Sequence, residues 1–223
     1  MLVSGSTEDM ELVDLTTKQS CILPFPLKWV QGGLISETKA HLCNFESALK
    51  CVLLNLSTLK TTFSDATVSK VARTSSVMLK GQIASTGGRI DNSHSQITDQ
   101  VQMVSLTESS INDQGLPGGK VESHCILHIN STTLMSIGGY KGYSVPKTWF
   151  MHVNANGNSW TSVSGKHCLK ITSKSLIRIW FSGPDLKKAR EFHSCDTFEY
   201  QSDIYIIVVG GFRRIPYEEL KTT

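Results

Sequence analysis

Three apolar runs in this chain end in a pair of glycines. They span Ile83 to Gly88, Leu134 to Gly139 and Ile206 to Gly211. The first two glycine pairs lie 51 positions apart and the last two lie 72 positions apart. Glycine has no Cβ and adopts positive φ readily, so a glycine pair at the end of a strand lets the backbone pass where a side chain would clash. The recurrence predicts a structural repeat of about fifty residues.

The rest of the chain has the pattern of an all-β protein. No long run places apolar residues at helical spacing, whereas short β-rich runs recur between clusters of Gly, Ser, Asn and Pro. We therefore expect antiparallel strands joined by turns. The clearest runs span residues 11–15, 51–56, 101–106, 148–153 and 204–209.

The order of residues around the glycine pairs resembles the kelch repeat, which builds the four-stranded blades of a β-propeller. Cys21 to Pro24 is also similar to the Cys-x-Leu-Pro strand exit of some invertebrate kelch-like proteins. The resemblance implies that the glycines lie where blades crowd at the hub, that a Trp fills the space between blades, and that the Arg and His side chains hydrogen-bond neighbouring turns. The structural motif so implied comprises Gly87, Gly88, Gly138, Gly139, Gly210, Gly211, Trp160, Arg73, His124, Arg190 and His193.

Five approximate repeats are expected, at residues 1–30, 31–70, 71–120, 121–161 and 186–223. Kelch propellers commonly close from six blades, and roughly 200 repeat residues are too few for six blades of about fifty. We therefore expect a kelch-type β-propeller of about four to five blades in an incomplete ring. An open ring exposes edge strands, so the chain is expected to be a fragment, or to dimerise or aggregate when expressed alone.

The segment after Trp160 is longer than the repeat allows. Removing residues 162–181 joins Thr161 to Ser182 and restores the usual kelch link to the next blade, so we interpret this stretch as an insert or a retained intron. The competing interpretation is a basic amphipathic helix, which the Ser and β-branched residues disfavour. Its basic face would comprise Lys166, Lys170, Lys174 and Arg178.

The charge distribution argues against a nucleic-acid partner. The formal net charge is +3, from 22 basic and 19 acidic residues. Without the four basic residues of the 162–181 stretch, 18 basic residues face 19 acidic ones. The chain therefore lacks the broad basic field of a phosphate-binding domain. No apolar run has the length that a membrane span needs.

The cysteines are compatible with buried thiols or with disulfides. They form no CxxC pair and no metal-ligand spacing, so we expect no zinc site. Cys43 and Cys51 are close enough to face each other across a hairpin. The compartment stays open: no secretory signal is visible, yet two glycosylation-type triplets, Asn55-Leu56-Ser57 and Asn130-Ser131-Thr132, favour the outside of the cell. The six cysteines are Cys21, Cys43, Cys51, Cys125, Cys168 and Cys195.

No residue pattern indicates catalysis, a cofactor or a metal. His124, His128 and His152 lie in one repeat, and kelch propellers include copper oxidases of the galactose oxidase type, but that family's ligand motifs are not matched here. Gly-x-Ser-x-Gly is absent. Cys125 and Cys195 are interpreted as small buried fillers at equivalent repeat positions.

Recognition is the function class that remains. Propeller loops from several repeats form a binding rim, and we expect contacts from the loops Arg89 to Gln100 and Lys141 to Lys147, with Tyr140 and Tyr143 as possible partner-binding residues. The ligand would be a protein or a glycan. An alternative is the substrate-recognition part of a ubiquitin-ligase adaptor, which needs BTB and BACK helices upstream.

Overall fold

The computed structural model describes residues 2–4, 10–14, 17–23, 30–45, 51–90, 96–112, 115–116, 119–154, 157–162, 185–201 and 203–214. Within these ranges the chain forms seventeen β-strands and no helix. The all-β expectation is therefore confirmed. The described part accordingly contains no helix of the length and apolarity needed to cross a membrane.

The strands form five open antiparallel sheets, each a meander in which consecutive strands pair. We number the sheets 1 to 5 along the chain. Sheet 1 contains β1 (Leu2–Ser4), β2 (Met10–Asp14) and β3 (Gln19–Ile22); sheet 2 contains β4 (Val30–Ser36), β5 (Lys39–Asn44), β6 (Val52–Asn55) and β7 (Lys60–Phe63). Sheet 3 contains β8 (Ser75–Leu79), β9 (Gln82–Thr86), β10 (Val101–Val104) and β11 (Ser109–Asn112); sheet 4 contains β12 (Cys125–Asn130), β13 (Thr133–Ile137), β14 (Thr148–Asn154) and β15 (Gly157–Ser162). Sheet 5 contains β16 (Glu191–Tyr200) and β17 (Asp203–Phe212).

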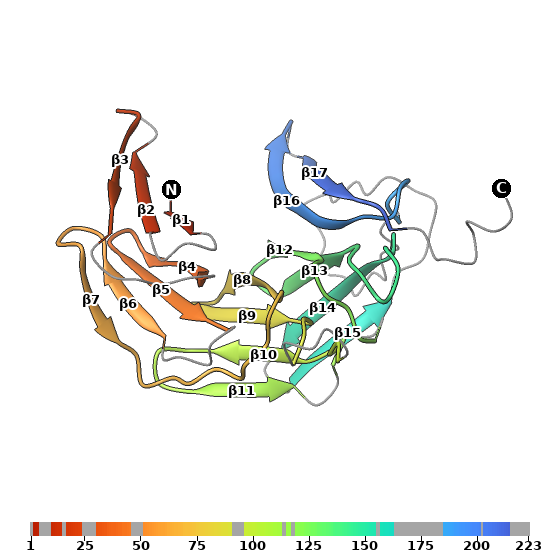
Figure 1. The fold of residues 1–223 in the computed structure, drawn as a ribbon, viewed down its shortest axis with the longest axis horizontal. Coiled ribbons are helices and arrows are strands. Elements are labelled where there is room, and N and C mark those ends of the chain that lie inside the picture. The colour runs from red at the N-terminus through yellow and green to blue at the C-terminus, as the bar shows by residue number, and fades with distance from the viewer. Residues whose placement is uncertain are drawn as a thin grey trace, which may run out of the picture.

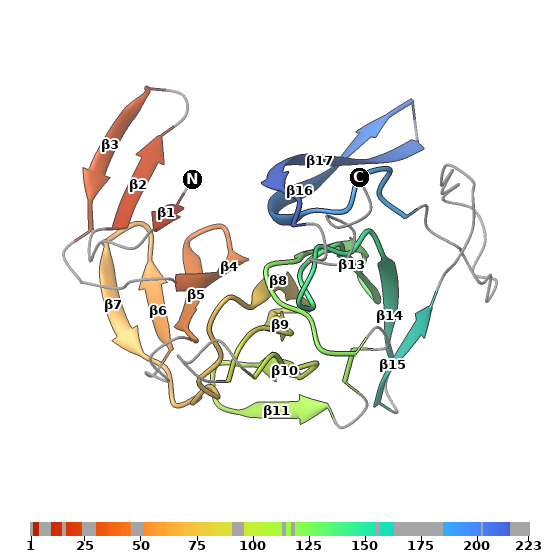
Figure 2. The ribbon, with the colours of Figure 1, turned by 45° about the vertical axis from the view of Figure 1, so that its right-hand side comes forward.

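The five sheets follow one another around an open arc (Figure 1). Sheet 1 lies at one end and sheet 5 at the other, with a gap between them that is also open in a second view (Figure 2). The first strands of neighbouring sheets, β4, β8, β12 and β16, lie side by side on the inner side of the arc, and β7, β11 and β15 lie on the outer side. Of the expected 162–181 insert, only Ser162 at the end of β15 lies within the described residues.

The first strands run in the same direction. Gln31, near the start of β4, donates from Nε2 to the carbonyl of Thr74, which precedes β8. The amide of Ser123, just before β12, donates to the carbonyl of Arg73, and the amide of Phe192, in β16, donates to the carbonyl of Ser123. The starts of all four strands therefore lie on the same side of the arc, and each neighbours the start of the next.

This common direction divides the sheet ends into two rims. The loop rim comprises the loops that follow Thr86 and Ile137, at the ends of β9 and β13. The hairpin rim is opposite, because the turns after the first and third strands of an antiparallel meander lie at the other end of the sheet. Within the described residues it comprises the turns at residues 37–38, 56–59, 80–81, 105–108 and 131–132.

The core lies between consecutive sheets, not inside any one of them. Because side chains alternate along a strand, neighbouring residues of β9 serve two cores: Ile83 packs with Cys43 and Val104 between sheets 2 and 3, and Ala84 packs with Ile126 between sheets 3 and 4. A further core separates sheets 4 and 5, where Leu127, Met135 and Phe150 contact Ile206 and Val208. Sheets 3 and 4 are thus covered on both faces.

Candidate functional site

Gly87 and Gly138, the first glycines of two of the three pairs, lie where the second strand of a sheet passes close to the next sheet, whereas nothing lies within 4 Å of the Cβ position of Gly210. All six glycines have positive φ, between 60° and 108°. A Cβ on Gly87 would lie 2.3 Å from the carbonyl oxygen of Val121, and a Cβ on Gly138 would lie 2.9 Å from that of Arg190. Val121 and Arg190 each belong to the segment that enters the first strand of the following sheet. At these positions the backbone of one sheet therefore passes directly against the next sheet.

Two histidines complete these inter-sheet contacts. His124 Nε2 lies 2.7 Å from Thr86 Oγ1, and His193 Nε2 donates to the carbonyl of Ile137 at 3.1 Å. Cε1 of each ring lies 2.8 Å from where a Cβ would stand on Gly87 or Gly138, respectively. Each histidine therefore joins the first strand of its sheet to the end of the second strand of the preceding sheet.

Burial keeps both rings neutral. Burial, and to a smaller extent the repulsion that a charged His193 would exert, lower the pKa of His124 to about 3. Burial also lowers the pKa of His193, although its hydrogen bond to Ile137 opposes this shift. A neutral ring accepts a proton only at a large free-energy cost here. The two histidines are thus placed as structural contacts.

The remaining motif residues occupy separate places. The Arg73 guanidinium lies 5.4 Å from the centre of the Phe192 ring and 3.8 Å from Glu122. Arg190 donates from Nη1 to the carbonyl of Gly210 at 2.9 Å. Trp160 lies on β15, and its side chain is outside the described residues.

Two fully buried carboxylates, neither of them expected from the sequence, lie beside these contacts. Glu122 is bound by the Arg89 guanidinium through two hydrogen bonds. Glu191 lies 3.0 Å from Arg214 Nε and accepts a hydrogen bond from Ser144 Oγ at 3.4 Å. Burial raises the pKa of Glu191, and the charge of Arg214 opposes that shift. The available signal was Glu-x-His, which occurs at residues 122–124 and 191–193.

Of the two loops expected to contact a partner, residues 91–95 of the Arg89 to Gln100 loop lie outside the described residues, whereas the Lys141 to Lys147 loop is described throughout. Arg89 is only 6% exposed and is paired with Glu122. Contrary to the expectation for this loop, Arg89 is therefore not available to contact a partner. Tyr140 is held by backbone hydrogen bonds to Glu122 in both directions, and its ring lies under Arg214 at 5.0 Å. Tyr143 is 45% exposed on the loop rim. Of the two tyrosines, Tyr143 is therefore the one available to a ligand.

Within the described part of the chain, four cysteines form two disulfides, Cys43–Cys51 and Cys125–Cys195. The interpretation of Cys125 and Cys195 as equivalent fillers is wrong. Cys125 directly follows His124, whereas Cys195 stands two positions after His193, and this offset lets β12 and β16 be joined covalently between sheets 4 and 5. The Cys43–Cys51 disulfide links neighbouring strands within sheet 2.

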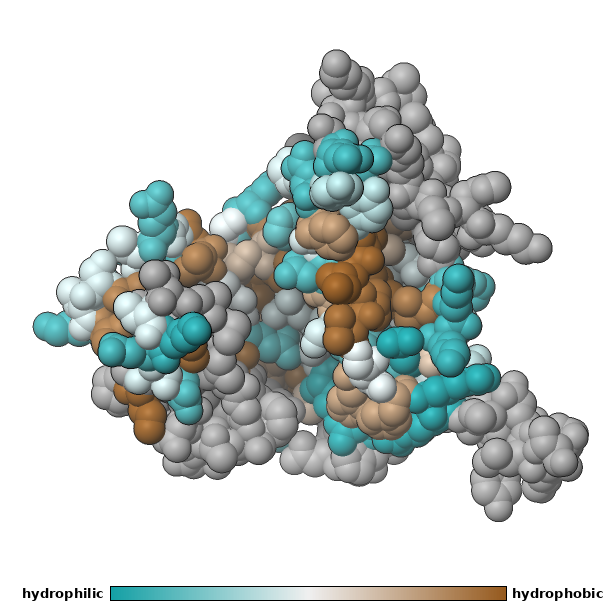
Figure 3. All heavy atoms as spheres, turned by 90° about the horizontal axis from the view of Figure 1, so that it is seen from above, coloured by the Kyte–Doolittle hydropathy of each residue, from teal (hydrophilic) through white to brown (hydrophobic). Residues whose placement is uncertain are grey.

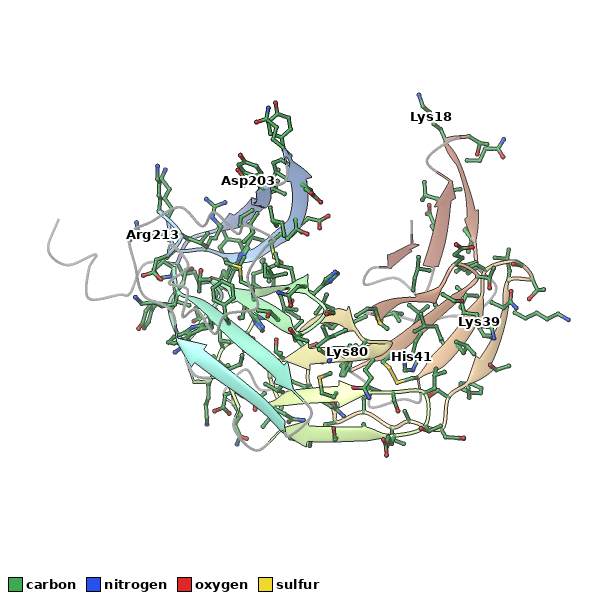
Figure 4. The ribbon with its side chains drawn as sticks, turned by 180° about the vertical axis from the view of Figure 1, so that it is seen from behind. Lys18, Lys39, His41, Lys80, Asp203 and Arg213 are labelled. Atoms are coloured by element: carbon green, nitrogen blue, oxygen red, sulfur yellow. A yellow bond between two sulfur atoms is a disulfide. The ribbon has the colours of Figure 1, made fainter. Side chains whose placement is uncertain are left out.

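A buried histidine lies beside the Cys43–Cys51 disulfide. His41, labelled in Figure 4, is on β5, and its Nε2 lies 3.9 Å from Cys43 Sγ. The three side chains have the donor atoms of a metal site within 4.8 Å of one another. Metal binding requires thiolates, and here the two sulfurs are bonded to each other, so this group does not offer a metal site in the disulfide state.

The outer face of sheet 5 exposes several large apolar side chains, with Ser194 and Asp196 between them. Phe198 and Tyr205 stack with ring centres 5.2 Å apart. Figure 3 shows apolar residues gathered at the position of the β16–β17 hairpin. The opposite face of this hairpin packs on sheet 4, so only one face is covered. We call the exposed set the sheet 5 outer face; it comprises Phe198, Tyr200, Tyr205, Ile207 and Val209.

Comparison with models of protein families gives no match, and comparison with curated proteins gives no match. The class that the structure defines is an all-β protein with five antiparallel sheets arranged in an open arc. Any functional conclusion therefore depends on the geometry of the chain itself.

Proposed function

We propose that this chain is an arc of a kelch-type β-propeller and acts as a non-catalytic scaffold that binds a protein or a glycan through its loop rim. Three features support the propeller. The sheets are meanders, their first strands lie together on the inner side, and apolar cores separate successive sheets. A radial array of blades has this organisation.

The observation that carries the proposal is the repeated glycine–histidine contact. Gly87 with His124, and Gly138 with His193, make the same approach at the same 2.8 Å spacing. Both contacts join the second strand of one sheet to the first strand of the next. An identical contact between successive sheets is expected when each sheet is related to the next by the same rotation about a hub.

The loop rim is the proposed binding surface. Loops held by a rigid β-scaffold commonly carry binding residues. Tyr143 presents an exposed amphipathic ring on a loop closed by a hydrogen bond from the Lys141 amide to the Tyr143 carbonyl, at 3.0 Å. Tyrosine of this kind contributes large contact area at low conformational-entropy cost.

The test is a ligand screen with matched variants. The purified chain would be screened on a glycan array and against a library of protein ectodomains, and each hit would be titrated against two variants. We expect Tyr143→Ala to weaken binding by about tenfold or more, and Lys39→Ala, on the exposed hairpin rim, to leave it unchanged. Binding that is insensitive to Tyr143→Ala but lost in Lys39→Ala would contradict the proposed surface, and chemical turnover of the ligand would contradict the non-catalytic assignment.

A further inference from the structure

The two acceptor triplets for N-linked glycosylation both lie on tight turns of the hairpin rim. Asn55 ends β6 and begins the turn to β7, and Asn130 ends β12 and begins the turn to β13. A triplet of this kind occurs often by chance, so its position decides whether it can carry a sugar. A glycan is bulky and polar and requires a surface position.

The turn at Asn130 brings the first and third residues of its triplet together. Thr132 donates to Asn130 Oδ1 from its amide at 2.9 Å and from its hydroxyl at 3.1 Å. Both residues are exposed, and within the described residues the Asn130 Nδ2 amide has no hydrogen-bond acceptor. The amide that would carry the sugar therefore lies on an exposed turn, and the triplet hydroxyl donates to the oxygen of the same amide.

The turn at Asn55 has a related but less complete arrangement. Asn55 Oδ1 accepts hydrogen bonds from the amides of Ser57 at 2.9 Å and Thr58 at 3.1 Å. Asn55 is half-buried, whereas Asn130 is exposed. Asn130 is therefore the better acceptor of the two.

A glycan on these turns would not interfere with a ligand on the loop rim. Because the first strands of the sheets run in one direction, the turns after β6 and β12 share the hairpin rim, opposite the Tyr143 loop. A glycan at either asparagine would leave the loop rim uncovered. The position of the two asparagine turns on the hairpin rim is the same whatever ligand the loop rim binds.

The disulfides provide an independent indication of compartment. Cys43–Cys51 is buried in the core between sheets 2 and 3, and Cys125–Cys195 joins sheets 4 and 5. Stable structural disulfides form in oxidising compartments such as the lumen of the endoplasmic reticulum. Transfer of N-linked oligosaccharides takes place in the same lumen.

From these observations we infer that Asn130 is a site of N-linked glycosylation, with Asn55 as a secondary site. The donor is an oligosaccharide linked to a lipid pyrophosphate, and the reaction requires an oligosaccharide transferase. Asn130 Nδ2 attacks the anomeric carbon, a C–N bond forms, and the C–O bond to the pyrophosphate breaks. The lipid pyrophosphate leaves with the bonding electron pair, and a base of the transferase takes the amide proton.

The experiment is secretion of the full chain from cultured eukaryotic cells behind a cleavable signal, followed by digestion with a peptide N-glycosidase. We expect faster migration after digestion and conversion of Asn130 to Asp in the peptide masses. Thr132→Ala should lower occupancy at Asn130 to about one tenth or less. Ser131→Ala is the matched control on the same turn and should keep the glycan, because the middle position accepts any residue except proline.

Two results would overturn the inference. One is secreted wild-type chain, with both disulfides shown by thiol counting, whose migration the glycosidase does not change. The other is an identical glycosidase shift in wild type and Thr132→Ala. If a variant is not secreted, the same digestion is applied to its endoplasmic-reticulum fraction, since the sugar is attached to the chain on entry and does not require export.

Discussion

Gly87 is restricted to glycine for two separate reasons. Its φ of 60° lies in the left-handed region, and a Cβ there would lie 2.3 Å from the backbone oxygen of Val121. Gly81 also has positive φ, at 77°, but nothing lies within 4 Å of its Cβ position. A substitution at Gly81 therefore introduces backbone strain alone, whereas one at Gly87 introduces both strain and a steric clash.

We expect Gly87→Ala to lower the free energy of unfolding by about 3 kcal/mol or more, because strain and a backbone clash add. Gly81→Ala should lower it by about 1 kcal/mol, from strain alone. Urea denaturation of both variants measures the difference. Equal losses would show that the second strand of sheet 3 does not pass as closely to sheet 4 as the structure indicates.

We expect His124 to make the folded chain less stable in acid. Its pKa falls from 6.5 to about 3 on folding because of burial and, second, the charge on His193. The unfolded chain thus binds the proton more readily than the folded chain between these values, so stability is lost as the pH falls below about 6.5. At pH 5 the protonation of His124 in the unfolded chain lowers the free energy of unfolding by about 2 kcal/mol relative to neutral pH.

The measurement compares wild type with His124→Gln, which removes the titrating ring and keeps a hydrogen-bonding side chain. The advantage of wild type should shrink by about 2 kcal/mol between pH 7.5 and pH 5. Using the variant as reference cancels the titration of Glu191, whose raised pKa acts in the opposite direction. A difference independent of pH would mean that His124 is not buried as a neutral ring.

At the scale of elements, sheet 5 depends on the disulfide that joins it to sheet 4. The hairpin has two strands, one covered face and a cross-link to β12 across a sequence separation of 70. By the chain-entropy model such a cross-link stabilises the fold by about 4 kcal/mol. The Cys43–Cys51 link closes a separation of only 8 and stabilises it by about 2.5 kcal/mol.

Replacing Cys125 and Cys195 together by Ala should therefore speed amide exchange most in β16 and β17. Hydrogen exchange measured by mass spectrometry resolves this, with β8–β11 as the internal reference. The control, Cys43→Ala with Cys51→Ala, should affect sheet 2 and leave β16–β17 protected. Uniform loosening of all sheets in the first variant would contradict a local role for the Cys125–Cys195 link.

At the scale of the whole molecule, the open arc leaves an apolar surface at one end. Ile207 and Val209 are 47% and 57% exposed on the sheet 5 outer face. Exposed apolar faces of this kind promote association. We expect the purified chain to self-associate and Ile207→Lys to shift it toward monomer, in sedimentation velocity over a concentration series.

The control is Ile111→Lys, which adds the same charge at an exposed apolar residue on the outer strand β11. This variant should associate as wild type does. A monodisperse wild-type monomer with a cooperative melting transition would contradict the expectation and would mean that the sheet 5 outer face does not mediate association.

Much of the architecture was predictable at the level of strands. The β-rich runs at 101–106 and 204–209 contain β10 and most of β17, because alternation and turn residues are local signals. The importance of the glycine pairs was also local, since a strand that must pass close to another backbone requires glycine. The Arg89–Glu122 pair was not predictable, because it joins residues 33 positions apart that meet only when sheets 3 and 4 pack.

By itself the sequence determined the all-β class, the placement of the paired glycines with positive φ and the positions of the triplets at Asn55 and Asn130, because each depends on a few neighbouring residues. Only the tertiary structure decided which cysteines pair, that His124 and His193 are buried and neutral, and that both asparagine turns share one rim. These properties arise from the packing of one sheet against the next, which brings together residues far apart in the chain and removes them from water.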